Sequence, residues 1–120
     1  MVLVYALLAP TTAEAKEIQR SPYEWHMGRL AALSAPQPDG ATWDALRSTA
    51  DPLAMSDAEY EALCEISLFV GDPDSFCEKL AVLRDAGVRQ IVPWMGAGGV
   101  AQEHVLRSMR LLKEVMPRFT

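Results

Sequence analysis

The glycines near the end of the chain have the clearest chemical spacing in the sequence. In the stretch WMGAGGVA, Gly96, Gly98 and Ala101 fit the pattern G-x-G-x-x-G/A, which lets a backbone approach a pyrophosphate at the start of a helix. A dinucleotide site also needs an acidic residue about 20 positions further on, at the end of the next parallel strand. The sequence stops at Thr120 without such a strand, and no Lys-Ser or Lys-Thr follows the glycines as a P-loop requires. We therefore expect a strand-to-helix connection rather than a pyrophosphate cradle.

Five residues of this connection are candidates for binding a cofactor, namely Trp94, Met95, Gly96, Gly98 and Gly99. An aromatic ring, a thioether and exposed backbone amides can line a pocket for a flat, largely apolar ring system. The alternative is packing, in which the glycines let the backbone approach a neighbouring loop while Trp94 and Met95 belong to the core at a strand end. The sequence leaves both interpretations open.

The remaining polar side chains form no catalytic constellation, so no catalytic residue is predicted. His26 and His104 fall on separate expected helices, and we expect surface or packing roles for both because a general base must also reach a substrate. Glu103 and Arg107 are four residues apart near the start of the last helix and are expected to form an i,i+4 pair.

Two further pairs also favour structural roles. Asp72 and Asp74 are expected to be helix-start carboxylates. Cys64 and Cys77 lack the spacing of a metal site, and two thiols are too few for a disulfide framework, so buried free thiols and no metal are expected.

The first third of the chain predicts a strand followed by helices. Val2 to Leu8 is a continuous apolar run, typical of a strand that is covered on both faces. Thr11 and Glu14 have the spacing of a capping box and predict a helix to about Arg20, and Ser21-Pro22 repeats the start signal for a second helix to about Leu33. Residues 34–55 are predicted to be a linker or insertion.

The second half shows the clearest alternation of strand and helix signals. Its expected elements are a helix over Asp57 to Cys64 after the capping box of Ser56 and Glu59, a strand over Ile66 to Val70, a helix from Pro73 that Asp72 caps and Gly87 follows, a strand over Val88 to Met95, and a helix over Ala101 to Met116. Short connections between such units predict an α/β fold with a parallel sheet or barrel. Because a closed barrel has eight strands and about 250 residues, we expect one domain over residues 1–120 that is a partial (β/α)8 barrel.

Composition excludes several classes of partner. Half of the 120 residues are apolar, 22% are charged, and the formal net charge is -5, which suits a packed globule. No two Lys or Arg residues are adjacent, so neither a nucleic acid nor an anionic membrane is expected as a partner. No stretch is long enough to span a membrane and a signal peptide is disfavoured, so we expect a cytoplasmic location.

Residues 67–119 resemble the carboxyl-terminal end of the bacterial-luciferase-like flavin-dependent monooxygenases. The shared features are G-x-P at Gly71 and Pro73, A-G-V at Ala86 to Val88, the pair Gly98-Gly99, E-x-V-x-x-S-M at Glu103 to Met109, and V-M-P-R-F at Val115 to Phe119. The start of the chain, VLVYALLAPTTAEAKE, is similar to a strand and A-x-T-x-x-E-A helix opening of that family. About half of the chain is covered, and the motifs are mostly structural.

This resemblance implies a TIM barrel that uses reduced flavin mononucleotide, or a deazaflavin, on a small-molecule substrate. It implies also that this chain represents the last barrel units, with little activity alone, because much of the flavin phosphate site of the family lies in the amino-terminal portion. The alternative is a non-catalytic partial barrel that covers its strand edges by pairing with a copy of itself or with a separate amino-terminal subunit.

Overall fold

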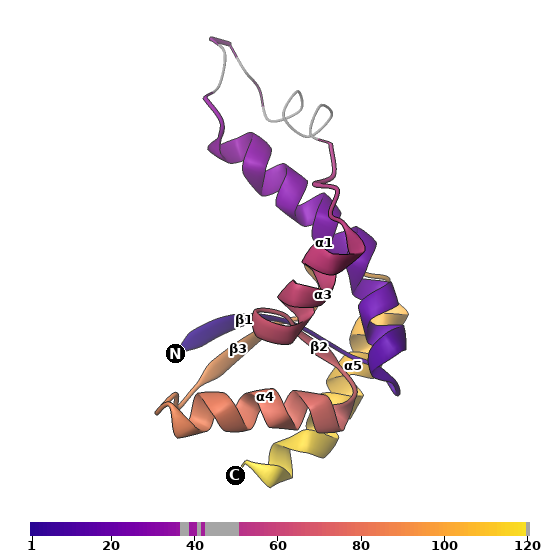
Figure 1. Cartoon of the computed structure of the whole chain (residues 1–120), viewed down its shortest axis with the longest axis vertical. Helices are drawn as coiled ribbons and strands as arrows, with labels where there is room; N and C mark the ends of the chain where they lie inside the picture. Colours follow the sequence, from indigo (N-terminus) through magenta and orange to yellow (C-terminus); the bar gives the residue numbers. More distant parts are fainter. Residues whose placement is uncertain (37–38, 41, 43–50, 120) are drawn as a thin grey trace.

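A parallel sheet forms the centre of the molecule in the computed structural model, which describes residues 1–36, 39–40, 42 and 51–119 (Figure 1). Half of the predicted linker over residues 34–55 lies outside these residues. The strands are β1 (Val2–Leu8), β2 (Phe69–Gly71) and β3 (Ile91–Trp94). The helices are α1 (Thr12–Ser34), α3 (Asp57–Ile66), α4 (Pro73–Asp85), α5 (Gln102–Val115) and the 3-10 helix η1 (Met116–Arg118). The predicted α/β class with a parallel sheet is confirmed.

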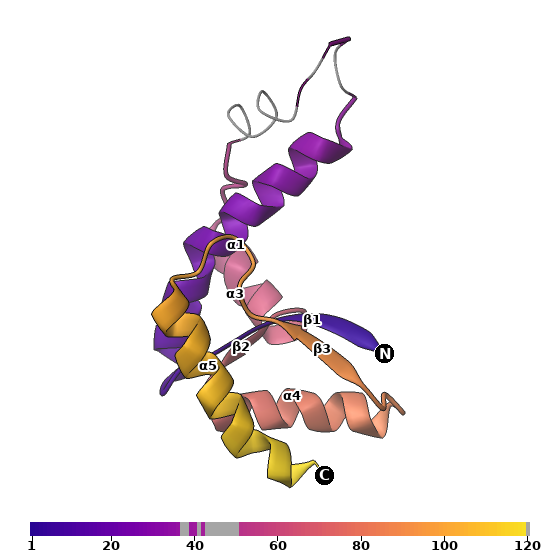
Figure 2. The same cartoon turned by 180° about the vertical axis from the view of Figure 1, so that it is seen from behind.

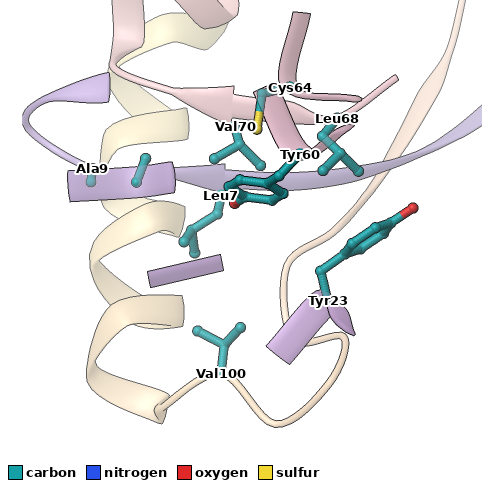
Figure 3. Close-up of a cluster of buried hydrophobic side chains, with 9 residues drawn as sticks. Leu7, Ala9, Tyr23, Tyr60, Cys64, Leu68, Val70 and Val100 are labelled. Atoms are coloured by element: carbon teal, nitrogen blue, oxygen red, sulfur yellow. The ribbon is translucent and has the colours of Figure 1, made fainter. Parts of the chain in front are cut away.

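The two faces of the sheet are covered by different pairs of helices. Tyr5 and Leu7 of β1 pack in the cluster on the side of α1 and α3. Figure 3 shows Leu7 in this cluster with Tyr23 of α1 and Tyr60 of α3. The residues that alternate with them on β1 pack with α4 and α5 around Phe76. Figures 1 and 2 show α3 and α4 on opposite sides of the strands. Burial on both faces explains why β1 is apolar at every position.

The strand order is β2-β1-β3, with β1 in the middle. Leu7 of β1 pairs with Val70 of β2, and Tyr5 pairs with Trp94 of β3. Successive units of a (β/α)8 barrel instead place their strands side by side in chain order. The order found here is that of an open sheet whose crossover helices lie on both faces.

Local capping signals are confirmed at three helices. Thr11 accepts a hydrogen bond from the Glu14 N–H, although the Glu14 side chain binds elsewhere. Ser56 and Glu59 form the full reciprocal capping box of α3. Asp72 caps α4 by accepting from the Ser75 N–H, with Pro73 as the next residue. Each of these capping residues lies within four residues of the backbone N–H that it binds, so the caps can be predicted from the local sequence.

Predicted boundaries fail where packing decides them. The expected break at Pro22 is wrong, because α1 runs through it as one helix with Ala15 and Tyr23 buried on either side, and this burial offsets the lost hydrogen bond. Ile66 ends α3 rather than starting a strand. Likewise β3 starts at Ile91 and not Val88, because its partner strand β1 begins at Val2, which pairs with Ile91.

Both outer strands carry features that oppose pairing with a further strand. The Val2 N–H donates to the Gln90 carbonyl, so in the parallel ladder the backbones of Ile91 and Pro93 face away from β1. Pro93 has no N–H to offer at this edge. The opposite edge is the three-residue β2, where the backbone N–H and C=O of Val70 face away from β1 while its side chain is buried. Proline and short length are common protections of a sheet edge.

Candidate functional site

Four aromatic side chains from β1, β3 and α1 form what we call the aromatic wall: Tyr5, Tyr23, His26 and Trp94. The Tyr5 and Trp94 rings are stacked, with centroids 5.4 Å apart and planes 19° from parallel. Tyr23 meets Tyr5 edge to face at 5.5 Å, and His26 meets Trp94 edge to face at 5.0 Å. These distances and tilts are the preferred geometries of aromatic pairs.

One hydrogen bond fixes the polar edge of the wall. The Tyr5 hydroxyl and the His26 Nε2 atom lie 3.1 Å apart, with the donor set by the histidine tautomer. Tyr23 lies deeper in the wall and is buried. Its burial raises the pKa of its hydroxyl, and the nearby Tyr5 raises this pKa to a smaller extent. The wall can therefore present one stacking surface and one polar pair to a ligand.

The wall opens to solvent at its β3 end. The Trp94 side chain is 41% exposed, while Leu3 on β1 and Val92 on β3 are 57% and 40% exposed. In the parallel register Leu3 pairs with Val92, and Tyr5 pairs with Trp94. The side chains of these two pairs therefore lie on the same face of the sheet. Apolar side chains are therefore exposed next to one another on this face of the sheet.

The predicted cofactor-binding residues divide between this surface and the interior. Trp94 stands on the wall, but Met95 is buried in the cluster on the other face of the sheet, so its side chain does not line the wall. Gly98 has φ 78° and lies so close to α1 that an added Cβ would be 1.7 Å from the Pro22 carbonyl oxygen. At Gly96 an added Cβ would meet nothing within 4 Å, and the same holds for Gly99, whose φ is 79°. Close packing therefore explains Gly98, whereas the backbone is open at Gly96 and Gly99.

Ser108 provides a hydrogen-bond acceptor for β1 beyond the point where β3 ends. The Ala9 N–H donates to the Gly71 carbonyl on β2, so the preceding Leu8 N–H points to the β3 side, beyond the end of β3. Ser108 of α5 is fully buried there, and its Oγ accepts from the Leu8 N–H at 2.8 Å. The serine of the motif at residues 103–109 thus has a structural task.

The other polar candidates form local or interhelical contacts. Arg107 pairs with Glu14 of α1 at 2.8 Å, so the expected pair with Glu103 is wrong: the α1 carboxylate reaches the guanidinium from the neighbouring helix. His104 Nε2 lies 3.9 Å from Glu103. Asp74 pairs with Arg118 at 3.0 Å, in keeping with a structural role at the start of α4.

The free thiols occupy different environments. Cys64 is buried and Cys77 is half-buried, so the prediction of buried free thiols holds fully for Cys64. Burial raises the pKa of Cys64, which disfavours a reactive thiolate. The Lys79 ammonium binds the carbonyls of Cys64 and Leu68, and it thereby satisfies the carboxyl end of α3.

The sequence predicts only part of the aromatic wall. It indicates Trp94 at the site, a surface or packing role for His26, and no role for Tyr5 or Tyr23. Pairing of Tyr5 with Trp94 depends on the strand register, and His26 comes close only because α1 continues past Pro22. The predicted second helix from Pro22 to about Leu33 already places Tyr23 and His26 three residues apart on one side, and this spacing was the available signal.

The sequence matches no family model and no curated protein. Within the described ranges, no helix combines the length and apolar character needed to cross a membrane. Among those same residues, no three His, Cys, Asp or Glu side chains gather as a metal site.

Proposed function

We propose that the chain binds the planar ring of a flavin, either flavin mononucleotide or a deazaflavin, against the aromatic wall, as part of a luciferase-like flavin-dependent oxidoreductase. The observation that carries the proposal is the Trp94 indole, which is held by Tyr5 in a stacked arrangement and is still 41% exposed. A fixed, exposed indole is a stacking surface for a flat ring. The resemblance of residues 67–119 favours a flavin among planar ligands.

The residues around Trp94 suit the ring of this cofactor. The Tyr5 hydroxyl and His26 imidazole supply polar atoms beside the stacking surface, and the open backbone at Gly96 and Gly99 supplies amides. A bound flavin would supply hydride transfer or oxygen activation, which are chemistries of the cofactor. The protein would orient the ring and shield one of its faces from water.

The partial (β/α)8 barrel belongs to the same proposal. In a barrel, β3 would lie beside β2, whereas here it lies beside β1. Because the aromatic wall depends on β3 lying beside β1, amino-terminal barrel units would have to join this chain without separating these two strands. The full oxidoreductase activity is proposed for such a complex, and ring binding for the chain itself.

A titration with flavin mononucleotide tests the proposal. We expect saturable quenching of flavin fluorescence by the 120-residue chain, and about tenfold weaker binding by Trp94→Leu, because one stacking contact of about 1.4 kcal/mol is removed. The matched control is Trp25→Leu, which alters an exposed indole on α1 that contacts Arg29 rather than the wall. Absence of saturable quenching, or equal weakening by both variants, would refute ring binding at the wall.

A second candidate is a non-catalytic association module, and it is favoured by apolar side chains left exposed on several elements. Beyond Leu3 and Val92, Ile66 at the end of α3 is 79% exposed. Protected edges at Pro93 and β2 direct such association to side-chain surfaces rather than to strand addition. A monomer at all concentrations in sedimentation velocity would exclude this candidate.

A further inference from the structure

A groove of about 430 Å³ runs beside β3, on the face of the sheet covered by α4 and α5. Its floor is apolar, with Leu80 and Leu83 from α4, Ile91 from β3 and Leu112 from α5. We call it the basic groove, because Arg84 and Arg89 are the ionisable side chains among the described residues that line it.

The charges of the basic groove contrast with those of the whole chain. The formal net charge of the protein is -5, but in residues 79–119 basic side chains outnumber acidic ones. Arg84 already contacts Asp85 and lies over the Phe119 ring. Arg89 is exposed, and the described part of the chain places no carboxylate within ion-pair distance of it. The groove is therefore suited to an apolar segment that carries negative charge.

Helix α3 presents such a segment to solvent. Tyr60 and Cys64 form its buried side. On the opposite side Ala58, Ala62 and Ile66 are spaced four residues apart and are all exposed. We call this row the α3 ridge.

Carboxylates flank the α3 ridge on both sides. Glu59 and Glu65 are exposed and lie about 60° to either side of Ala62 around the helix axis. Alanines permit close approach and the terminal isoleucine offers apolar area, so the ridge matches the helix-in-groove mode of recognition.

We propose that the α3 ridge of one copy docks in the basic groove of a second copy. Glu59 and Glu65 would face Arg84 and Arg89, and Ile66 would lie on the apolar floor. The ridge and the groove belong to helices on opposite faces of the sheet, so one chain cannot satisfy both surfaces by itself (Figure 1). Because each copy carries both surfaces, the contact is head-to-tail and extends to further copies unless it closes into a ring. This contact identifies the two surfaces through which the association module would self-associate, and it does not depend on flavin binding.

Sedimentation velocity of the full chain over about 1 to 200 μM tests this docking. We expect the mean sedimentation coefficient to rise with concentration and to fall when salt is raised from about 50 to 500 mM, since exposed ion pairs are screened. A wild-type chain that stays monomeric throughout this range overturns the proposal.

Charge exchange identifies the two surfaces. Arg89→Glu and Glu65→Arg should each be monomeric alone, because like charges then meet, whereas their equimolar mixture should associate like the wild type. Glu17→Arg is the matched control, since it reverses an exposed carboxylate on α1 that belongs to neither the ridge nor the groove. Association of either single variant alone, or failure of the mixture while Glu17→Arg still associates, overturns the proposed pairing.

The apolar part of the contact has its own variant. Ile66→Ser should weaken association at least about tenfold because it removes a side chain buried only in the assembly. Circular dichroism and urea unfolding of the dilute variants should match the wild type, since all four substituted residues are exposed. Unchanged association by Ile66→Ser would overturn the docking of the ridge.

Discussion

Ser108→Ala tests whether a single hydroxyl completes the sheet. In the wild type the Ser108 Oγ accepts from the Leu8 N–H at 2.8 Å, and neither group reaches solvent. The alanine variant leaves this N–H buried without a partner, at a cost of about 1 to 3 kcal/mol. The small volume removed adds little, although the Oγ contact with the Met95 sulfur at 3.5 Å is also lost. Against a total stability of about 5 to 15 kcal/mol, the expected loss of about 2 kcal/mol is large.

Urea unfolding followed by tryptophan fluorescence measures this loss. We expect a lower midpoint at an unchanged slope, and a fall in Tm of roughly 10 °C for a domain of this size. Ser34→Ala is the control, because the Ser34 hydroxyl binds the Leu30 carbonyl at the exposed end of α1 and its removal should cost less than about 0.5 kcal/mol. If Ser108→Ala also costs less than about 0.5 kcal/mol, or if the two variants are equal, the Leu8 N–H does not depend on Ser108.

Two other substitutions follow from backbone geometry and capping. Gly98→Ala should destabilise the fold by at least about 2 kcal/mol in the same assay, since its Cβ would overlap the Pro22 carbonyl at an unfavourable φ of 78°, while Gly96→Ala should be neutral; equal effects would contradict the packing explanation. The hydrogen bond from the Ser75 N–H lowers the pKa of Asp72, so its contribution to stability is present above the unfolded value of about 3.9 and is lost as pH falls through the lower folded value. Asp72→Asn keeps a cap but has no titrating charge, so its stability deficit relative to the wild type should shrink below about pH 4; a deficit that is constant from pH 7 to pH 2 would contradict this.

Sequence signals predicted the elements whose causes are local. The caps at Thr11, Ser56 and Asp72 were correct because each side chain bonds a backbone N–H within its own first turn. Pro22 misled because the same proline either starts a helix or is tolerated inside one, and only the burial of its neighbours decides. The start of β3 at Ile91 could not be predicted locally, because it is set by pairing with Val2 of β1, which is distant in the sequence.

The candidate site was predicted in part for the same reason. Trp94 was found because it ends a strand beside a glycine loop, a local pattern. Its stacking partner Tyr5 could not be deduced, because the order β2-β1-β3 sets that contact and nothing in the local sequence specifies the order. Met95 was grouped with Trp94, but the alternation of side chains along a strand sends it to the opposite face.

The central position of β1 has a consequence for biosynthesis. Its register joins it to residues about 60 and about 90 positions further along the chain, so the sheet cannot form while β1 leaves the ribosome. At translation rates of about 5 to 20 residues per second, the segment VLVYALL waits roughly 5 to 20 s for both partners. This segment contains no charge and no proline, so during that interval it is an unprotected β-aggregation motif. Newly made chains should therefore depend on chaperone cover of residues 2–8 until Trp94 has emerged.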